Sequence, residues 1–296
     1  MTRVGITIFI GLFAACGPGH GNGPDGGGDD DNGGGDGSGS SNTETKAGLF
    51  TIESSRYTVS TTEVEQGYAT GMMYRIPPIT SGGGGSCTNT TKGSCDIQTC
   101  TAGMTTTDGG LAITYTDSGP VKISGVQVND GTMTLTPGGY GYVTVSGGVA
   151  LFNGGDTVRW LAPGNPSGAP AFDVSLVAPT AVQVTAPTFV QGKVTASATQ
   201  SLGVAWSGTT NTAVTVQLAG GTSGQSVLAR CTFTGTSGVV PAEVVSAIRA
   251  VGGSASIMVM MESRATRNPD GWNIAFSLQT YGLIPSGVAV GTLEIL

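Results

Sequence analysis

Apolar and polar residues alternate along several stretches of the chain. In the run 272–279, which follows the turn-forming stretch 268–271, every second residue from Trp272 to Leu278 is apolar. The same period appears at 202–206 and 227–233. A period of two predicts half-buried strands with one face toward a core. Trp160, Trp206 and Trp272 each share a strand face with apolar neighbours, so we expect all three in the core.

Many further segments read as strands, and only one reads as a helix. Residues 241–248 begin with a proline and an early acidic residue, a pattern typical of a helix N-terminus. Asp130-Gly131 predicts a tight hairpin turn, and strand spacings of 8–12 residues with Gly-rich turns are typical of sandwiches. The predicted fold class is an all-β sandwich of two packed Ig-like lobes with one short helix. The further predicted strands are 111–116, 120–126, 132–136, 141–146, 157–162, 172–177, 181–186, 212–218, 256–262 and 287–295.

Composition narrows the class of protein. Charged residues make up only 10% of the 296 residues, Gly accounts for 51 of them, and the net charge is −7. Nucleic-acid binding relies on clustered Lys and Arg to neutralise phosphates. We therefore expect no nucleic-acid partner.

Residues 1–16 have the pattern of a lipoprotein signal peptide. Arg3 is followed by an uncharged stretch, 4–15, which is shorter than the roughly 20 residues that span a bilayer. It ends in Ala14-Ala15-Cys16, which resembles the lipobox of bacterial lipoproteins, although Phe13 stands where Leu is usual. The resemblance implies lipidation, typically with palmitate, at Cys16. Lipid attachment would make the membrane a partner of this protein.

The stretch that follows predicts a disordered tether. Residues 17–46 are rich in Gly and Asp and hold no large apolar side chain, so they cannot offset the entropy of ordering. The folded part begins at Ala47, where the period of two starts. Pro179 and Pro187 flank a strand and suggest a boundary near 190, so we expect one lobe at 47–190 and a second at 191–296.

The whole pattern resembles the Gly/Asp-tethered lipoproteins common in myxobacteria and their relatives, which largely lack a described activity. The resemblance implies a β-sandwich lipoprotein and carries over no catalytic residue. The strand and turn segments that carry it are 119–123, 152–156, 162–164, 170–172, 179, 202–206, 231–233 and 238–241.

Candidate chemistry in the folded part is sparse. The single histidine, His20, lies in the tether, which excludes His-dependent hydrolysis and His-ligated zinc from the folded part. Most acidic residues stand beside Gly, Ser or Thr at predicted turns and are interpreted as solvated loop positions. We expect no enzyme activity, no cofactor and no metal site. A glycoside hydrolase, which needs two carboxyl groups facing one sugar, is the second alternative.

Two tyrosines and four cysteines are the remaining candidates. Tyr140 and Tyr142 share the less apolar face of a predicted strand, and exposed rings can stack on sugars. The cysteines other than Cys16 are disulfide candidates, because export permits disulfides and four thiols allow three pairings. The pattern favours one local bridge among the first three and a second to the last. These candidates are Cys87, Cys95, Cys100 and Cys231.

The sequence thus predicts a lipid-anchored protein of the bacterial cell envelope. Gly17 after the lipidated Cys is compatible with sorting to the outer membrane, on its periplasmic face or at the cell surface. The ectodomain would have a structural or binding role. The first alternative is a surface adhesin module that binds a carbohydrate or protein partner.

Overall fold

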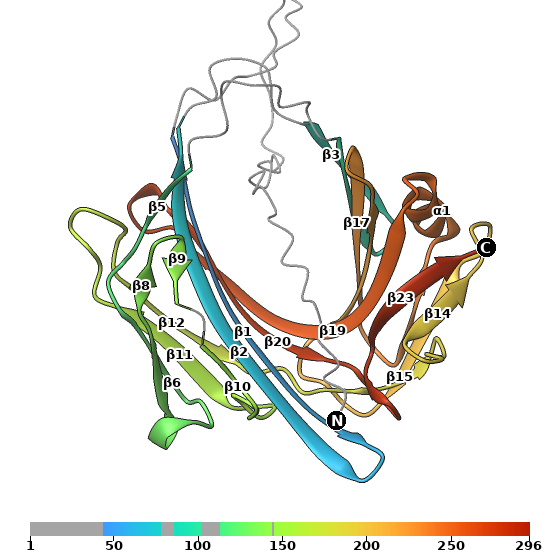
Figure 1. The fold of residues 1–296 in the computed structure, drawn as a ribbon, viewed down its shortest axis with the longest axis horizontal. Helices are drawn as coiled ribbons and strands as arrows, with labels where there is room; N and C mark the ends of the chain where they lie inside the picture. Colours follow the sequence, from blue (N-terminus) through green and yellow to red (C-terminus); the bar gives the residue numbers. More distant parts are fainter. Residues whose placement is uncertain (1–43, 78–85, 102–112, 144) are drawn as a thin grey trace, which may run out of the picture. The chain divides into compact units, whose positions relative to one another are not determined.

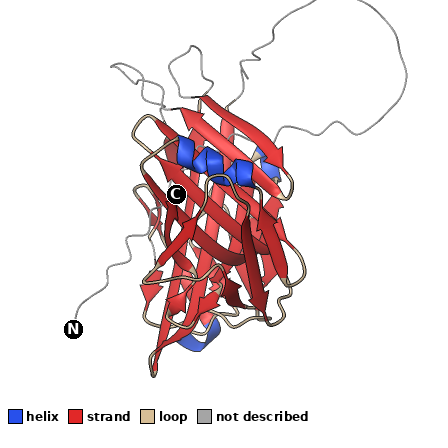
Figure 2. Ribbon diagram, turned by 90° about the vertical axis from the view of Figure 1, so that its right-hand side faces the viewer, coloured by secondary structure: helices blue, strands red, loops and turns tan. Residues whose placement is uncertain are grey.

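Strands make up most of the computed structural model, which describes residues 44–77, 86–101, 113–143 and 145–296 (Figures 1 and 2). The chain divides into two units, 1–39 and 40–296, and the structure below is that of the second unit. The predicted signal peptide, Cys16, His20 and most of the predicted tether therefore lie outside the described residues.

The largest element is a twelve-stranded sheet that runs through the whole unit. Its central path is mostly antiparallel, with one parallel pair between β1 and β20. Three strands join at its sides: β5 (Thr114–Thr116) pairs with β2, β23 (Val290–Ile295) with β19, and β14 (Lys193–Ala196) with β23. The path consists, in spatial order, of β10 (Val145–Gly147), β2 (Thr62–Ile76), β1 (Thr45–Val59), β20 (Asn273–Tyr281), β19 (Ser254–Arg267), β16 (Val214–Gly221), β17 (Gln225–Phe233), β4 (Cys95–Thr101) and β3 (Ser86–Lys92).

Three smaller sheets accompany it. The four-stranded sheet consists of β12 (Phe172–Val177), β11 (Thr157–Ala162), β6 (Val121–Ser124) and β7 (Thr132–Leu135). The five-stranded sheet consists of β18 (Ser237–Val240), β15 (Leu202–Ser207), β13 (Gln183–Ala186), β21 (Leu283–Ile284) and β22 (Gly287–Val288). The two-stranded sheet pairs β8 (Pro137–Gly138) with β9 (Gly141–Tyr142).

One α-helix occurs in the described part of the chain. Helix α1 (Ala242–Ala250) follows Pro241 and buries Val244, Val245 and Ile248 against the sheet. Figure 2 shows it in blue, lying across the strands. Two short 3₁₀ turns, Asn129–Gly131 and Pro269–Gly271, precede β7 and β20, and they stand where the sequence predicts turns.

Two hydrophobic cores form on one and the same face of the twelve-stranded sheet. Residues two apart on a strand point to the same side, and Ile257 and Val259 of β19 lie in one core while Ala265 packs against the other. The core that contains Trp160, against which Ala265 packs, is covered by the four-stranded sheet. The core that contains Ile257 and Val259 is covered by the five-stranded sheet, α1, β14 and β23.

The predicted all-β sandwich with one short helix is thus confirmed. The three tryptophans are buried as expected, and several predicted strands match closely, among them 157–162 and 172–177. Neither core is built from one continuous half of the chain. Strand β4 packs with the strands after residue 180, and β20, near the C-terminus, packs with β1 and β2. The lobe boundary near 190 stays a prediction about how the unit folds.

The longest strands, β1 and β2, are missing from the sequence-based predictions. In β1 the core position Ser54 is polar, and its hydroxyl donates to the Phe152 carbonyl oxygen and accepts from the Leu151 amide. In β2 a Cβ at Gly71 would lie 2.5 Å from the Phe50 ring, so only glycine fits there. Polar and glycine residues at core positions interrupt the period of two that starts at Ala47, so the pattern does not mark where these two strands begin and end. Because β1 begins at Thr45, the last two residues of the predicted tether belong to it.

Candidate functional site

The face of the twelve-stranded sheet that points away from both cores carries a row of polar side chains. We call this face the inner face; the row consists of Tyr68, Glu53, Gln279 and Glu262. These four are in register on neighbouring strands, since Tyr68 pairs with Glu53, Glu53 with Gln279, and Gln279 with Glu262. Arg230 of β17 lies on the same face outside this row and reaches Glu262 through an ion pair. Figure 1 shows the sheet bent, with α1 and the smaller sheets on its outer side and no described strand or helix inside the bend.

Glu262 is the centre of this face. Its Oε2 lies 2.6 Å from Arg230 Nη2 and its Oε1 lies 3.3 Å from Arg264 Nη2. The same Oε1 accepts hydrogen bonds from Ser277 Oγ at 2.6 Å and Gln279 Nε2 at 3.0 Å. Burial alone would raise the pKa of this carboxyl group. The two guanidinium charges and the two hydrogen bonds outweigh burial and hold the pKa below its ordinary value.

Glu53 lies in a different environment two strands away. Its Oε2 accepts one hydrogen bond, from the Tyr281 hydroxyl at 2.8 Å, and no ion pair to it occurs among the described residues. Burial raises the pKa of Glu53, and the hydrogen bond from Tyr281 offsets this only in part. Burial, and then the charge of Glu53, raise the pKa of Tyr281. Tyr281 is therefore a fixed hydrogen-bond donor at neutral pH.

The carboxyl groups of Glu53 and Glu262 lie on either side of the Gln279 side-chain amide. With strands about 4.8 Å apart, the backbones at Glu53 and Glu262 are separated by roughly 10 Å, with Gln279 between them. Ser55 follows on the same face of β1 and is 3% exposed, and its hydroxyl has no hydrogen-bond partner in the structure. A buried hydroxyl without a partner is costly unless a ligand or water satisfies it.

The interpretation of acidic residues as solvated loop positions is wrong for Glu53 and Glu262. Both lie well inside strands and both are held in hydrogen-bonded networks. A signal for this site does exist in the sequence. The predicted strand 272–279 places Ser277 and Gln279 on its polar side, and 256–262 ends at Glu262. Pairing between these strands is a tertiary fact that the pattern does not contain.

The structure separates Tyr140 from Tyr142. Tyr140 is 84% exposed and its ring meets Tyr115 edge-on, with ring centroids 5.6 Å apart. Tyr142 is buried against Phe50, and its hydroxyl accepts from the Ser118 amide. Gly141 between them has a positive φ, so the strand alternation that places both rings on one face breaks there. Tyr142 has no ring face free for a ligand, and the expected stacking pair is not formed.

All four cysteines of the described unit are paired. Cys87 is joined to Cys100 within the β3–β4 hairpin, and Cys95 to Cys231 between β4 and β17. The Gly/Thr-rich segment that holds the first three cysteines is an edge hairpin. Both bridges are structural and leave no thiol for chemistry in that hairpin.

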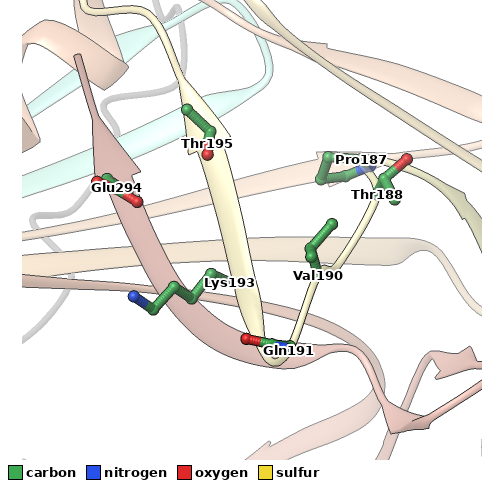
Figure 3. Close-up of a pocket in the computed structure, with 7 residues that line it drawn as sticks. All are labelled: Pro187, Thr188, Val190, Gln191, Lys193, Thr195 and Glu294. Carbon is green, nitrogen blue, oxygen red and sulfur yellow. The ribbon is translucent and has the colours of Figure 1, made fainter.

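Two surface hollows lie elsewhere. Figure 3 shows one beside β14 and β23, where Lys193 and Glu294 stand near the 187–191 loop. It offers one cation and one carboxylate on exposed strands and no convergent set of polar groups. The second lies at Lys46 and Arg75, where the Arg75 guanidinium donates to the Gly168 carbonyl oxygen and sits 5.5 Å from the Trp272 ring centre. These contacts fix a loop, and the buried Nε of Arg75 has no hydrogen-bond partner in the structure.

Among the described residues, no cluster of three or more His, Cys, Asp or Glu side chains has the arrangement of a metal site. None of the described helices is long and apolar enough to cross a membrane. No protein family model, curated protein or solved structure matches the chain.

Proposed function

We propose that this protein is a binding module tethered to the bacterial cell envelope by lipid on Cys16. The sequence of residues 1–46 supports the anchor, through its lipobox-like end and its Gly/Asp-rich spacer. The sandwich supports the binding role. The resemblance to myxobacterial lipoproteins and the placement at the outer membrane belong to the same proposal.

The inner face is the observation that carries the binding role. Ion pairs between solvent-exposed side chains are normally weak and loosely held. Here Glu262 alone receives two guanidinium groups and two neutral donors, and the neighbouring Glu53 is fixed by Tyr281. Polar groups held in place before a ligand arrives reduce the entropy cost of binding.

The anchor is tested by expressing the full chain in a bacterium supplied with labelled palmitate. We expect label on the wild-type chain and none on a Cys16→Ser variant, and we expect globomycin to cause the unprocessed precursor to accumulate. A wild-type chain that is secreted without label would contradict the anchor.

A glycoside hydrolase is the second candidate, and one observation favours it. Glu53 and Glu262 flank Gln279, and their surroundings push the two pKa values in opposite directions, as acid and base roles require. Carboxyl groups of glycosidases stand about 5–9.5 Å apart. Release of reducing ends from polysaccharides by the wild-type chain, abolished in Glu53→Gln, would support hydrolysis. Binding of a polysaccharide without release of reducing ends would contradict hydrolysis and support the binding module.

A further inference from the structure

We propose that the inner face binds a neutral glycan, laid across the strands over Tyr68, Glu53, Gln279 and Glu262. This inference rests on the binding function proposed above and names its ligand class. It assigns the ligand to a row of side chains that does not include the exposed Tyr140, whose ring meets Tyr115.

Hydrogen-bonding capacity is the first argument. Gln279 presents an amide between two carboxyl groups, and Tyr281 adds a hydroxyl group beside them. The fully buried Ser277 holds Glu262 and Gln279 in place from below. Carboxylates, amides and guanidinium groups match the vicinal hydroxyls of a sugar, which both donate and accept. Ser55 adds a hydroxyl that is nearly fully buried and has no partner. A ligand hydroxyl would satisfy it.

Ring surface is the second argument. Tyr68 is half-buried and stands directly opposite Glu53, and Tyr281 donates to the same carboxylate from the other side. The apolar face of a sugar ring packs on an aromatic ring while its hydroxyls reach polar neighbours. Tyrosines on both sides of Glu53 therefore suit a sugar better than a ligand without an apolar face.

Charge is the third argument, and it selects a neutral ligand. The carboxylate of Glu262 is paired with the guanidinium groups of Arg230 and Arg264. Glu53 has no ion pair among the described residues, and Asp96 stands cross-strand from Arg230. The face thus carries close to zero net charge. A polyanionic glycan would meet the unneutralised Glu53, and a polycationic one would meet the two arginines.

The test uses the full-length chain purified in detergent and an array of neutral oligosaccharides printed beside uronic-acid and sulfated ones. We expect retention of neutral glycans only. Titration calorimetry with a retained glycan should show binding weakened about ten-fold or more in Gln279→Ala, which removes the central amide. Tyr68→Ala is the second variant, and unfolding curves confirm that each variant is folded.

Tyr140→Ala is the matched control, because it removes an exposed tyrosine that is not part of the row formed by Tyr68, Glu53, Gln279 and Glu262. It should bind like the wild type. Loss of binding in Tyr140→Ala with retention in Gln279→Ala and Tyr68→Ala would overturn the inner face while leaving a binding module. Retention of acidic glycans alone, or of no glycan by the folded chain, would overturn the ligand class. The lipid-anchor proposal is tested independently of glycan binding, because it is contradicted only by absence of the palmitate label.

Discussion

Glu262 and Glu53 show how neighbouring carboxyl groups on one sheet acquire opposite properties. Glu262 is buried but paired with Arg230 and Arg264, so its ionised form is favoured. Glu53 is buried with a single neutral donor, Tyr281, so burial outweighs the hydrogen bond and its pKa is raised. The residue type and its place on the chain do not distinguish them. The difference comes from side chains that other strands bring alongside.

Stability at Glu262 should be lost on acidification. Because its folded pKa is lower than the ordinary value of 4.5, its stabilising effect is complete above 4.5 and disappears as the pH falls through the folded pKa. Glu262→Gln should lower the free energy of unfolding by about 1–3 kcal/mol near neutral pH. The loss should shrink in acid. Urea unfolding measured from about pH 3 to pH 8 checks this, and a loss independent of pH would contradict the charge network.

Glu53 should behave in the opposite way. Its folded pKa is raised above 4.5, so its favourable contribution is complete below 4.5 and is lost as the pH rises through the folded pKa. Glu53→Gln keeps an acceptor for Tyr281 and removes the buried charge. We expect it to match or exceed the wild type near neutral pH and to lose that advantage in acid. The same urea series measures it, and a large loss near neutral pH would mean that ionised Glu53 has a partner.

At the scale of elements, the sequence predicts strands that have one fully apolar face. It does not predict strands, such as β1 and β2, that have polar or glycine residues at core positions. The segments 157–162 and 172–177 alternate cleanly because their outer sides, with Arg159 and Asp173, are solvated. The edge hairpin β3–β4 is polar on much of its length, so no apolar period marks it as a pair of strands. Its place at the sheet edge depends on the two disulfides and on pairing with β17.

The two disulfides should differ in the stability they add. Cys95–Cys231 closes a sequence separation of 136 residues and Cys87–Cys100 one of 13. A longer closed loop restricts the unfolded chain more. Replacing both members of the Cys95–Cys231 pair with Ser should therefore cost about 2 kcal/mol more than the same change at Cys87–Cys100. Guanidinium unfolding of the two double variants measures this; equal losses would contradict it.

At the scale of the whole unit, one sheet serves two cores. Strand β19 supplies Val259 to the core with Leu218 and packs Ala265 against the core with Phe276. Detachment of β19 from the sheet would therefore expose apolar side chains of both cores. The covering layers differ, but the shared sheet links them. Placing both cores on one side also leaves the other side to the polar residues of the inner face.

This linkage predicts a single unfolding transition. Phe276→Ala in one core should lower stability by about 3–5 kcal/mol, and Leu218→Ala in the other by about 2–5 kcal/mol. Calorimetry should show each variant melting in one transition at a lower temperature, with matching calorimetric and van't Hoff enthalpies. Two separated transitions, of which a variant shifts only one, would instead indicate lobes that unfold independently.

The sequence by itself determined the class of the fold, because alternation of apolar side chains is a local property of each strand. It also determined that the three tryptophans belong to the core and that no histidine chemistry is available outside the tether. Only the tertiary structure decided which strands are neighbours. Register between β1, β20 and β19 brought Glu53, Gln279 and Glu262 into one row. That juxtaposition joins residues more than 200 positions apart, and strand pairing over such distances depends on how both cores pack, which no local pattern records.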